Sequence, residues 1–189
     1  YGGAANAGLH TLETGAFLGR TGELAEFGGI FNRTCHFVMK KMEEGLSYID
    51  AVKLALEEGI AEKNYILDTE GFDVAQKLVI QANTYGNKVY SLDDVKRTGL
   101  SQMNPETLIS PQGKIWRYVG RANLETNTLT VGPELLSKDS FLGSCLWTDK
   151  AVQFVTKTQG LQNIKSSNAP GNPTIGTALM DMVQIGLSL

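Results

Sequence analysis

The sequence predicts an α+β fold, because helical patterns come first, strand patterns follow, and one helical pattern ends the chain. A regular α/β protein would alternate strands and helices instead. The 189 residues suit one domain, or one domain with a small extension, and 42% apolar residues are enough for a packed core. No internal repeat or low-complexity linker divides the sequence.

The first sixty residues predict three helices and one strand. Residues 9–20 carry apolar side chains at rough helical spacing, and residues 25–31 are typical of a strand. Residues 34–42 predict a short helix with one apolar side. Ser47 begins a capping-box pattern, which predicts a further helix that ends near Gly59.

The clearest helical pattern lies in residues 72–85. We expect residues 68–71 to open this helix, because their carboxylates are favoured near the positive end of a helix dipole. Apolar residues then recur every three or four positions, which is typical of a helix that packs on a core. These residues are Phe72, Ala75, Leu78, Val79 and Ala82.

The second half of the chain predicts strands and one closing helix. Residues 115–121 and 126–131 are rich in β-branched and aromatic types and lie within hairpin distance, and residues 151–157 alternate cleanly. Asn172 and Pro173 are typical of a helix start. The helix that follows carries an apolar stripe of Ile175, Leu179 and Met182.

Composition argues against several classes of protein. Seventeen Lys and Arg against 20 Asp and Glu give a net charge of −3, so we expect no nucleic-acid partner. No apolar run approaches the roughly 20 residues that span a bilayer, so we expect no membrane partner. Cys35 and Cys145 have no metal or redox spacing, and two such thiols fit a reducing compartment such as the cytoplasm. Two histidines cannot make a multi-histidine zinc site.

One group of charged residues could carry chemistry: Glu62, Asp68, Asp73 and Lys77. Asp73 and Lys77 lie four residues apart in the clearest helix, so their side chains share a face. An ordinary solvated ion pair would have the same spacing. The alternative is that Lys77 is a proton donor held by Asp73, with further carboxylates that bind a substrate amine.

Two other patterns favour ordinary structure over chemistry. Residues 171–174 could bind an anion at a helix start, but a capped helix has the same pattern, and no P-loop lysine follows. Cys35 and His36 are adjacent in a helix, so their side chains diverge by about 100° and we expect core packing.

Several segments resemble the homoserine dehydrogenases. Residues 29–34 (G-I-F-N-R-T) resemble that family's strand-to-helix turn, G-I-x-x-G-T. Residues 59–62 (G-I-A-E) and 67–78 (L-D-T-E-G-F-D-V-A-Q-K-L) are similar to its signature G-x-x-E…D-x-x-G-x-D-x-x-x-K at every marked position. The resemblance covers nearly the whole chain but only the C-terminal part of the family's proteins. The chain begins at Tyr1, and we expect a fragment that lacks the family's Rossmann half.

The resemblance implies an enzyme that reversibly reduces aspartate 4-semialdehyde to homoserine with NADH or NADPH, in threonine, methionine and isoleucine biosynthesis. It also implies a mostly antiparallel sheet covered by helices, which makes a homodimer. Residues 1–165 would then form the substrate-binding, catalytic and dimerisation domain. Residues 166–189 would form a helix that returns to the absent nucleotide-binding domain. We expect the fragment alone to be inactive.

The same resemblance implies roles for individual residues. Lys77 would be the catalytic acid–base, and Asp73 would orient it and bind substrate. Glu62 would hold the substrate amine, and Asp68 would support it. Gly59, Glu62 and Gly171 would contact the cofactor.

The sequence departs from the family pattern at three places. Arg33 stands where the family usually has glycine, and Pro173 replaces a glycine of the turn before the last helix. Near the start, the backbone carbonyls of Ala5, Ala7 and Leu9 match positions that bind a monovalent cation in some members, although Gly2 replaces the acidic ligand. The alternative to an enzyme is therefore a regulatory module that binds an amino acid without a redox step.

Overall fold

The computed structural model describes residues 5–167 and 173–187, and within them a six-stranded sheet is the centre of the fold. The strand order is β2-β4-β3-β1-β5-β6. All neighbours are antiparallel except β2 and β4, which are parallel, so the expected mostly antiparallel sheet is confirmed. The strands are β1 (Leu24–Ile30), β2 (Val95–Arg97), β3 (Lys114–Asn123), β4 (Thr128–Ser137), β5 (Lys150–Thr156) and β6 (Leu161–Ser166).

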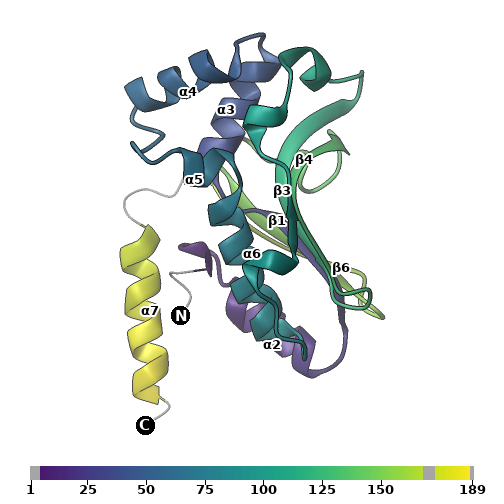
Figure 1. The fold of residues 1–189 in the computed structure, drawn as a ribbon. Helices are drawn as coiled ribbons and strands as arrows, with labels where there is room; N and C mark the ends of the chain where they lie inside the picture. Colours follow the sequence, from purple (N-terminus) through teal and green to yellow (C-terminus); the bar gives the residue numbers. More distant parts are fainter. Residues whose placement is uncertain (1–4, 168–172, 188–189) are drawn as a thin grey trace.

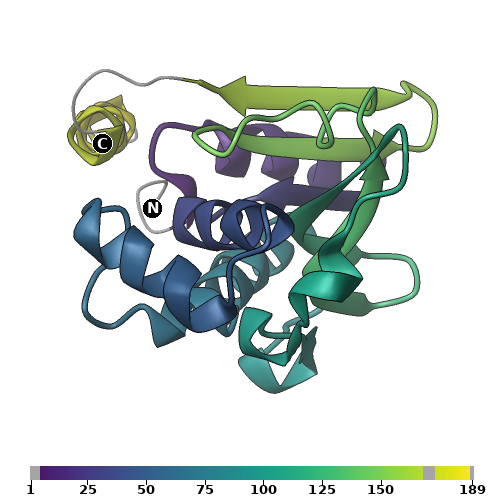
Figure 2. The ribbon, with the colours of Figure 1, turned by 90° about the horizontal axis from the view of Figure 1, so that it is seen from above.

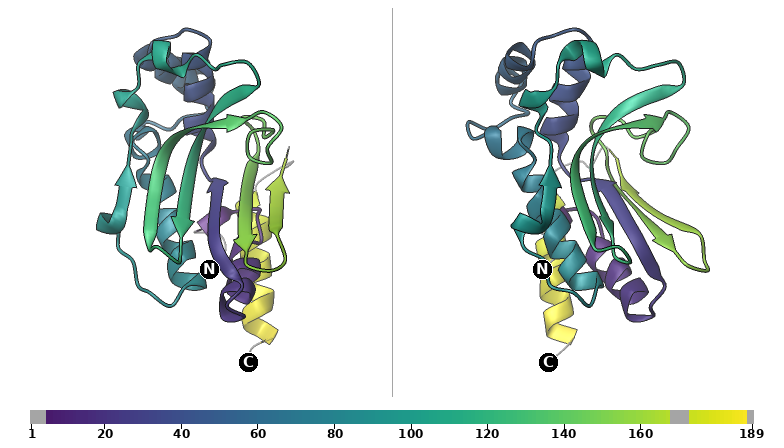
Figure 3. Two further views of the ribbon diagram at one scale, coloured as in Figure 1. Left: turned by 90° about the vertical axis from the view of Figure 1, so that its right-hand side faces the viewer. Right: turned by 45° about the vertical axis from the view of Figure 1, so that its right-hand side comes forward.

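The helices between residues 11 and 85 lie on one face of this sheet (Figure 1). Figure 3, on the left, shows the opposite face with no helix in front of it. Part of that face is covered by residues 138–149, where Leu142 and Cys145 pack on Ile30 and Val119. The α-helices are α2 (Thr11–Arg20), α3 (Arg33–Glu43), α4 (Tyr48–Glu57), α5 (Ile66–Thr69), α6 (Phe72–Tyr85) and α7 (Pro173–Leu187). Three 3₁₀ turns, η1 (Leu92–Asp94), η2 (Leu100–Gln102) and η3 (Pro105–Leu108), connect α6 to β3.

The core lies between the sheet and helices α2, α3 and α6. Phe27 of β1 and Phe31, which directly follows β1, are fully buried, as are Leu78 of α6 and Tyr118 of β3. A side chain at Gly19 of α2 would overlap the backbone of α6, so the two helices can approach only because this position is glycine. This packing fixes α6, which carries Asp73 and Lys77, against the sheet.

Helix α6 begins later than the sequence predicted. Residues 68–71 do not open it: Asp68 belongs to the short helix α5, and Gly71 separates the two helices. Gly71 has φ +76°, a left-handed conformation that glycine adopts without strain, and it is the residue directly before α6. The break lets Asp68 and Asp73 approach each other from two helices.

Pro173 is helical and is the first described residue of α7, while Asn172 lies outside the described residues. Its apolar stripe is not buried: Ile175, Leu179 and Met182 are 58–67% exposed. In Figures 1 and 2 the helix stands to one side of the sheet and the other helices. The Gly8 amide donates a hydrogen bond to Thr177 Oγ1 at 2.9 Å and ties α7 to the start of the described chain. No helix in the described ranges has the length and apolar character needed to cross a bilayer.

Candidate active site

The site is built where β1 runs into α3. Asn32, which is 8% exposed, caps α3: its Oδ1 accepts a hydrogen bond from the Cys35 amide at 3.0 Å. Its Nδ2 donates to Asp68 Oδ1 at 2.7 Å and to Asp73 Oδ2 at 2.8 Å. One amide therefore fixes the helix start and joins two carboxylates from α5 and α6.

Lys77 lies next to this pair of carboxylates. Its Nζ donates to Asp73 Oδ2 at 2.6 Å and to the Phe31 carbonyl at 3.1 Å. The side chains of Lys77 and Asp73 are only 18% and 28% exposed, so this is not a freely solvated pair. An ammonium has three N–H donors, and these two contacts leave one for a ligand.

The carboxyl group of Asp68 is partly buried. Burial raises the pKa of its carboxyl, hydrogen bonding from Asn32 opposes that rise, and the nearby charge of Asp73 adds to it. The fold therefore holds two like charges at short range, with Asn32 and Lys77 as their hydrogen-bond donors.

Two cavities of opposite character meet at this cluster. A cavity of about 320 Å³ is lined by acidic side chains, including Glu62, Asp68 and Asp73. A cavity of about 310 Å³ is lined by Lys77 and by Gly59, and no Asp or Glu lines it. Thr34 and Ile60 line both cavities, so the Asp73–Lys77 pair lies where they adjoin.

The structure shows the expected contact between Asp73 and Lys77 and places Asp68 and Glu62 at different distances from it in the network. Of the three expected carboxylates, that of Asp73 accepts a hydrogen bond from Lys77, and that of Asp68 is linked to the pair through Asn32. Glu62 is exposed and, among the described residues, has no ion pair with Lys77, because it lies in the irregular segment after Gly59 and faces the acidic cavity. Among the described residues, the Lys77 ammonium is therefore paired with one carboxylate, that of Asp73.

The two glycines expected near the cofactor have different outcomes. Gly59 has φ +68°, and apart from its chain neighbours no described residue has an atom within 4 Å of the place where a Cβ would stand. It lines the cavity beside Lys77, and its contact with a cofactor stays a prediction. Gly171 lies outside the described residues.

The expected cation ligands lie in the segment that precedes α2. Ala5 and Leu9 are buried, and the carbonyl of Ala7 accepts a hydrogen bond from Lys150 Nζ at 3.4 Å. An ammonium already lies against one of the three carbonyls, and like charges repel. Within residues 5–167 and 173–187, no three His, Cys, Asp or Glu side chains gather as metal ligands. These residues do not favour a cation, and the site stays a prediction.

Cys35 and His36 pack in the core, as expected. His36 Nε2 accepts the Tyr118 amide at 3.2 Å, and burial, with the charge of Arg117, lowers the pKa of this imidazole to about 3. Cys35 Sγ contacts the Asp68 carbonyl at 3.0 Å, and burial raises the pKa of its thiol. A buried neutral imidazole and a protonated thiol do not make a nucleophile pair.

Sequence reasoning missed two contributors to the site. Asn32 lies between strand β1 and helix α3, which is a signal for a cap but not for a bridge between carboxylates. Lys150 begins β5, and no local pattern marks it as a residue that lines the Lys77 cavity.

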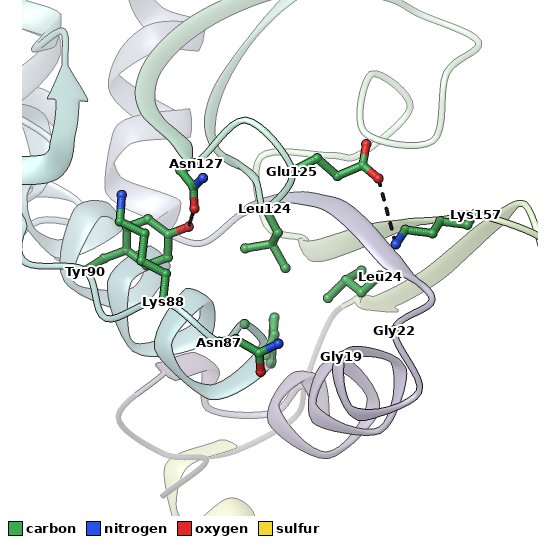
Figure 4. A pocket seen from close by; sticks show the side chains of 12 residues that line it. Gly19, Gly22, Leu24, Asn87, Lys88, Tyr90, Leu124, Glu125, Asn127 and Lys157 are labelled. Atoms are coloured by element: carbon green, nitrogen blue, oxygen red, sulfur yellow. Dashed lines mark hydrogen bonds and ion pairs between the residues drawn. The ribbon is translucent and has the colours of Figure 1, made fainter.

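A larger cavity, of about 440 Å³, lies at the other end of α6 (Figure 4). It is lined by Tyr85, Lys88 and Tyr90, and an ion pair of Lys157 and Glu125, at 3.9 Å, lies beside it. Asp73 and Lys77 lie in the first turns of α6, so the cavity of Figure 4 is separate from the acid–base cluster.

The sequence model of the homoserine dehydrogenase family matches residues 13–183. The chain belongs to the homoserine dehydrogenase family. It is 31% identical over 164 residues to a protein named NAD(+)-dependent homoserine dehydrogenase from Pseudomonas canavaninivorans, covering 84% of this chain and 47% of that protein. It is 34% identical over 157 residues to homoserine dehydrogenase from Methanocaldococcus jannaschii, covering 78% and 46%. The chain spans about half the length of the curated homoserine dehydrogenases it matches.

Solved structures of homoserine dehydrogenases have the same fold. The Staphylococcus aureus enzyme at pH 6.5 superposes with a TM-score of 0.78 at 27% identity, over 87% of this chain and 43% of that one. The Thiobacillus denitrificans structure gives a TM-score of 0.87 at 23% identity, over 97% and 44%, and shows the fold alone. The α+β architecture is thus that of homoserine dehydrogenases.

Proposed function

We propose that this chain is the catalytic domain of a homoserine dehydrogenase that uses NAD or NADP, and that a nucleotide-binding domain completes it. The reaction is the reversible reduction of aspartate 4-semialdehyde to homoserine, which serves threonine, methionine and isoleucine biosynthesis. The observation that carries the proposal is the position of Lys77. Its ammonium is held by Asp73 and the Phe31 carbonyl at the edge of an open cavity shared with Gly59.

The reduction needs a proton at the aldehyde oxygen as a hydride adds to the carbonyl carbon. The nicotinamide, when bound, supplies the hydride and is oxidised. Lys77 donates the proton from Nζ and becomes a neutral amine, and the C=O bond becomes an alcohol C–OH. In the reverse direction Lys77 takes the hydroxyl proton. Asp73 and the Phe31 carbonyl keep Nζ in place throughout.

The acidic cavity supplies the site for the substrate's α-ammonium. Glu62, Asp68 and Asp73 line it, and charge-assisted hydrogen bonds to carboxylates are strong and directional. Gly59 leaves room for the nicotinamide, while Glu62 and Gly171 would complete the contacts to the cofactor. We further propose a homodimer through the sheet and, because Cys35 and Cys145 are free thiols, a reducing compartment such as the cytoplasm.

The test is replacement of Lys77 by Met in the complete enzyme. The loss of a general acid should lower kcat for homoserine oxidation by about 10²–10⁴-fold. Lys53→Met is the matched control, because Lys53 also pairs with an acid on its own helix, Asp50 at 3.7 Å, but is well exposed. Wild-type kcat in Lys77→Met, with unchanged circular dichroism, would refute the proposal.

The alternative, an amino-acid-binding module without a redox step, has the same cavities. It predicts that the complete protein binds L-homoserine but does not oxidise it with either NAD or NADP. The 189-residue chain alone should not turn over homoserine, and NAD(P)-dependent turnover by it would contradict the need for a separate nucleotide-binding domain.

A further inference from the structure

Two cations outside the acid–base pair line the cavity beside Lys77. Arg33 is the first residue of α3 and Lys150 is the first residue of β5. Both line the 310 Å³ cavity together with Lys77, and both also line an adjoining cavity of about 180 Å³. Residues 117 positions apart in the sequence thus place their positive groups around one space.

These two charges are not balanced by the protein. Among the described residues neither Arg33 nor Lys150 forms an ion pair, and no Asp or Glu lines either of the two cavities. Lys77 is different, because Asp73 neutralises it. Lys150 is half-buried, and the one hydrogen bond that its ammonium makes to a described residue, the Ala7 carbonyl, is long at 3.4 Å. A partly buried cation without a carboxylate favours an anionic ligand.

The closeness of three cations affects the pKa of Lys150. Burial lowers its pKa to about 8, and repulsion from Lys77 and Arg33 adds to the effect. Asp73 opposes it only weakly. A bound anion would relieve that repulsion.

The acidic cavity next to the cavity beside Lys77 indicates which anion fits. Glu62, Asp68 and Asp73 line the acidic cavity, cations line the cavity beside Lys77, and Thr34 and Ile60 line both. An α-amino acid carries an ammonium and a carboxylate on the same carbon, so it can place one group in each cavity. We propose that Arg33 and Lys150 bind the α-carboxylate of the amino-acid substrate. The proposal rests on the proposed function, and it assigns to Arg33 and Lys150 the choice of an amino acid over a simple amino alcohol.

The experiment compares two substrates that differ only in the carboxylate, L-homoserine and 3-aminopropan-1-ol, in the complete enzyme. Arg33→Gln and Lys150→Met should each lower kcat/KM for L-homoserine about 10- to 100-fold, the usual effect of losing a charged hydrogen bond. The value for 3-aminopropan-1-ol, or its inhibition constant if it is not oxidised, should stay within about twofold, because this compound never made the contact. Lys150→Arg should restore most of the preference.

Lys96→Met is the control for a general loss of positive charge, because Lys96 is exposed on β2, at the far edge of the sheet from β5. It should leave both substrates unaffected. An equal loss for both substrates in Arg33→Gln and Lys150→Met would mean a structural role and would overturn the proposal. A rise in the cofactor KM with no change for L-homoserine would assign the two cations to a cofactor phosphate instead.

The carboxylate contact can also be tested if the proposed enzyme activity is absent. If the wild-type protein oxidises no homoserine, the carboxylate contact is tested by calorimetric titration with L-homoserine. Binding that is at least about tenfold weaker in the Arg33→Gln and Lys150→Met double variant than in wild type would support the contact. Equal binding, or no binding to wild type, would overturn it.

Discussion

The side-chain amide of Asn32 donates a hydrogen bond to Asp73, 41 residues later in the chain, at 2.8 Å. The same Asp73 oxygen, Oδ2, also accepts from Lys77 at 2.6 Å. Asn32 thus helps to set the position of the carboxylate that in turn positions the proposed proton donor.

Asn32→Asp separates the two tasks of this residue. An aspartate can still cap α3 through the Cys35 amide, but it cannot donate to Asp68 and Asp73 and would add a third negative charge. We expect the free energy of unfolding, measured by urea denaturation, to fall by about 1–3 kcal/mol, because two charged hydrogen bonds are lost while the helix cap remains. We expect kcat to fall by about tenfold or more, because Asp73 loses the donor that positions it. A kcat equal to wild type would show that the bridge has no part in catalysis.

Lys150 should make homoserine binding depend on pH. Burial, with repulsion from Lys77 and Arg33, lowers its pKa to about 8 and Asp73 opposes the shift, so the charge is present at pH 7 and mostly lost at pH 9. KM for L-homoserine should therefore rise about tenfold between pH 7 and pH 9 in wild type, as expected for the loss of one proton per molecule above the pKa. In Lys150→Met, KM should rise less between pH 7 and pH 9, and the remaining rise should come from deprotonation of the substrate's own ammonium. Parallel profiles for the two proteins would rule out the role of Lys150.

Gly71 should tolerate no side chain. Its φ is +76°, and a Cβ there would overlap the hydroxyl of Tyr118, which donates to the Thr98 carbonyl at 2.8 Å. Gly71→Ala should lower the free energy of unfolding by about 2–4 kcal/mol, from backbone strain plus overpacking.

Gly45→Ala is the matched control for Gly71→Ala. Gly45 has φ +101° but nothing within 4 Å of a Cβ, so only backbone strain of about 1–2 kcal/mol is expected. Chemical denaturation of both variants separates strain from overlap. An equal loss of unfolding free energy in the two variants would mean that the overlap with Tyr118 does not destabilise Gly71→Ala.

The sequence could predict those parts of the site that depend on local geometry. Asp73 and Lys77 meet because residues four apart share a helix face, and Cys35 and His36 diverge because neighbours do not. The bridge from Asn32 to Asp68 and the approach of Lys150 to Arg33 depend on tertiary packing, which no spacing shows. Strand β6 was missed because its side chains are half-buried or exposed and its pattern is weak.

Asp73 uses a single oxygen, Oδ2, for both Asn32 and Lys77, and no described residue donates to its Oδ1. Asp73 can therefore hold Lys77 in place through Oδ2 and accept a hydrogen bond from the substrate amine at Oδ1. The Asp73 carboxylate would then fix both the amine of a short amino-aldehyde and the lysine that faces its carbonyl. In a molecule one methylene longer or shorter, the carbonyl would not lie within hydrogen-bond distance of Lys77.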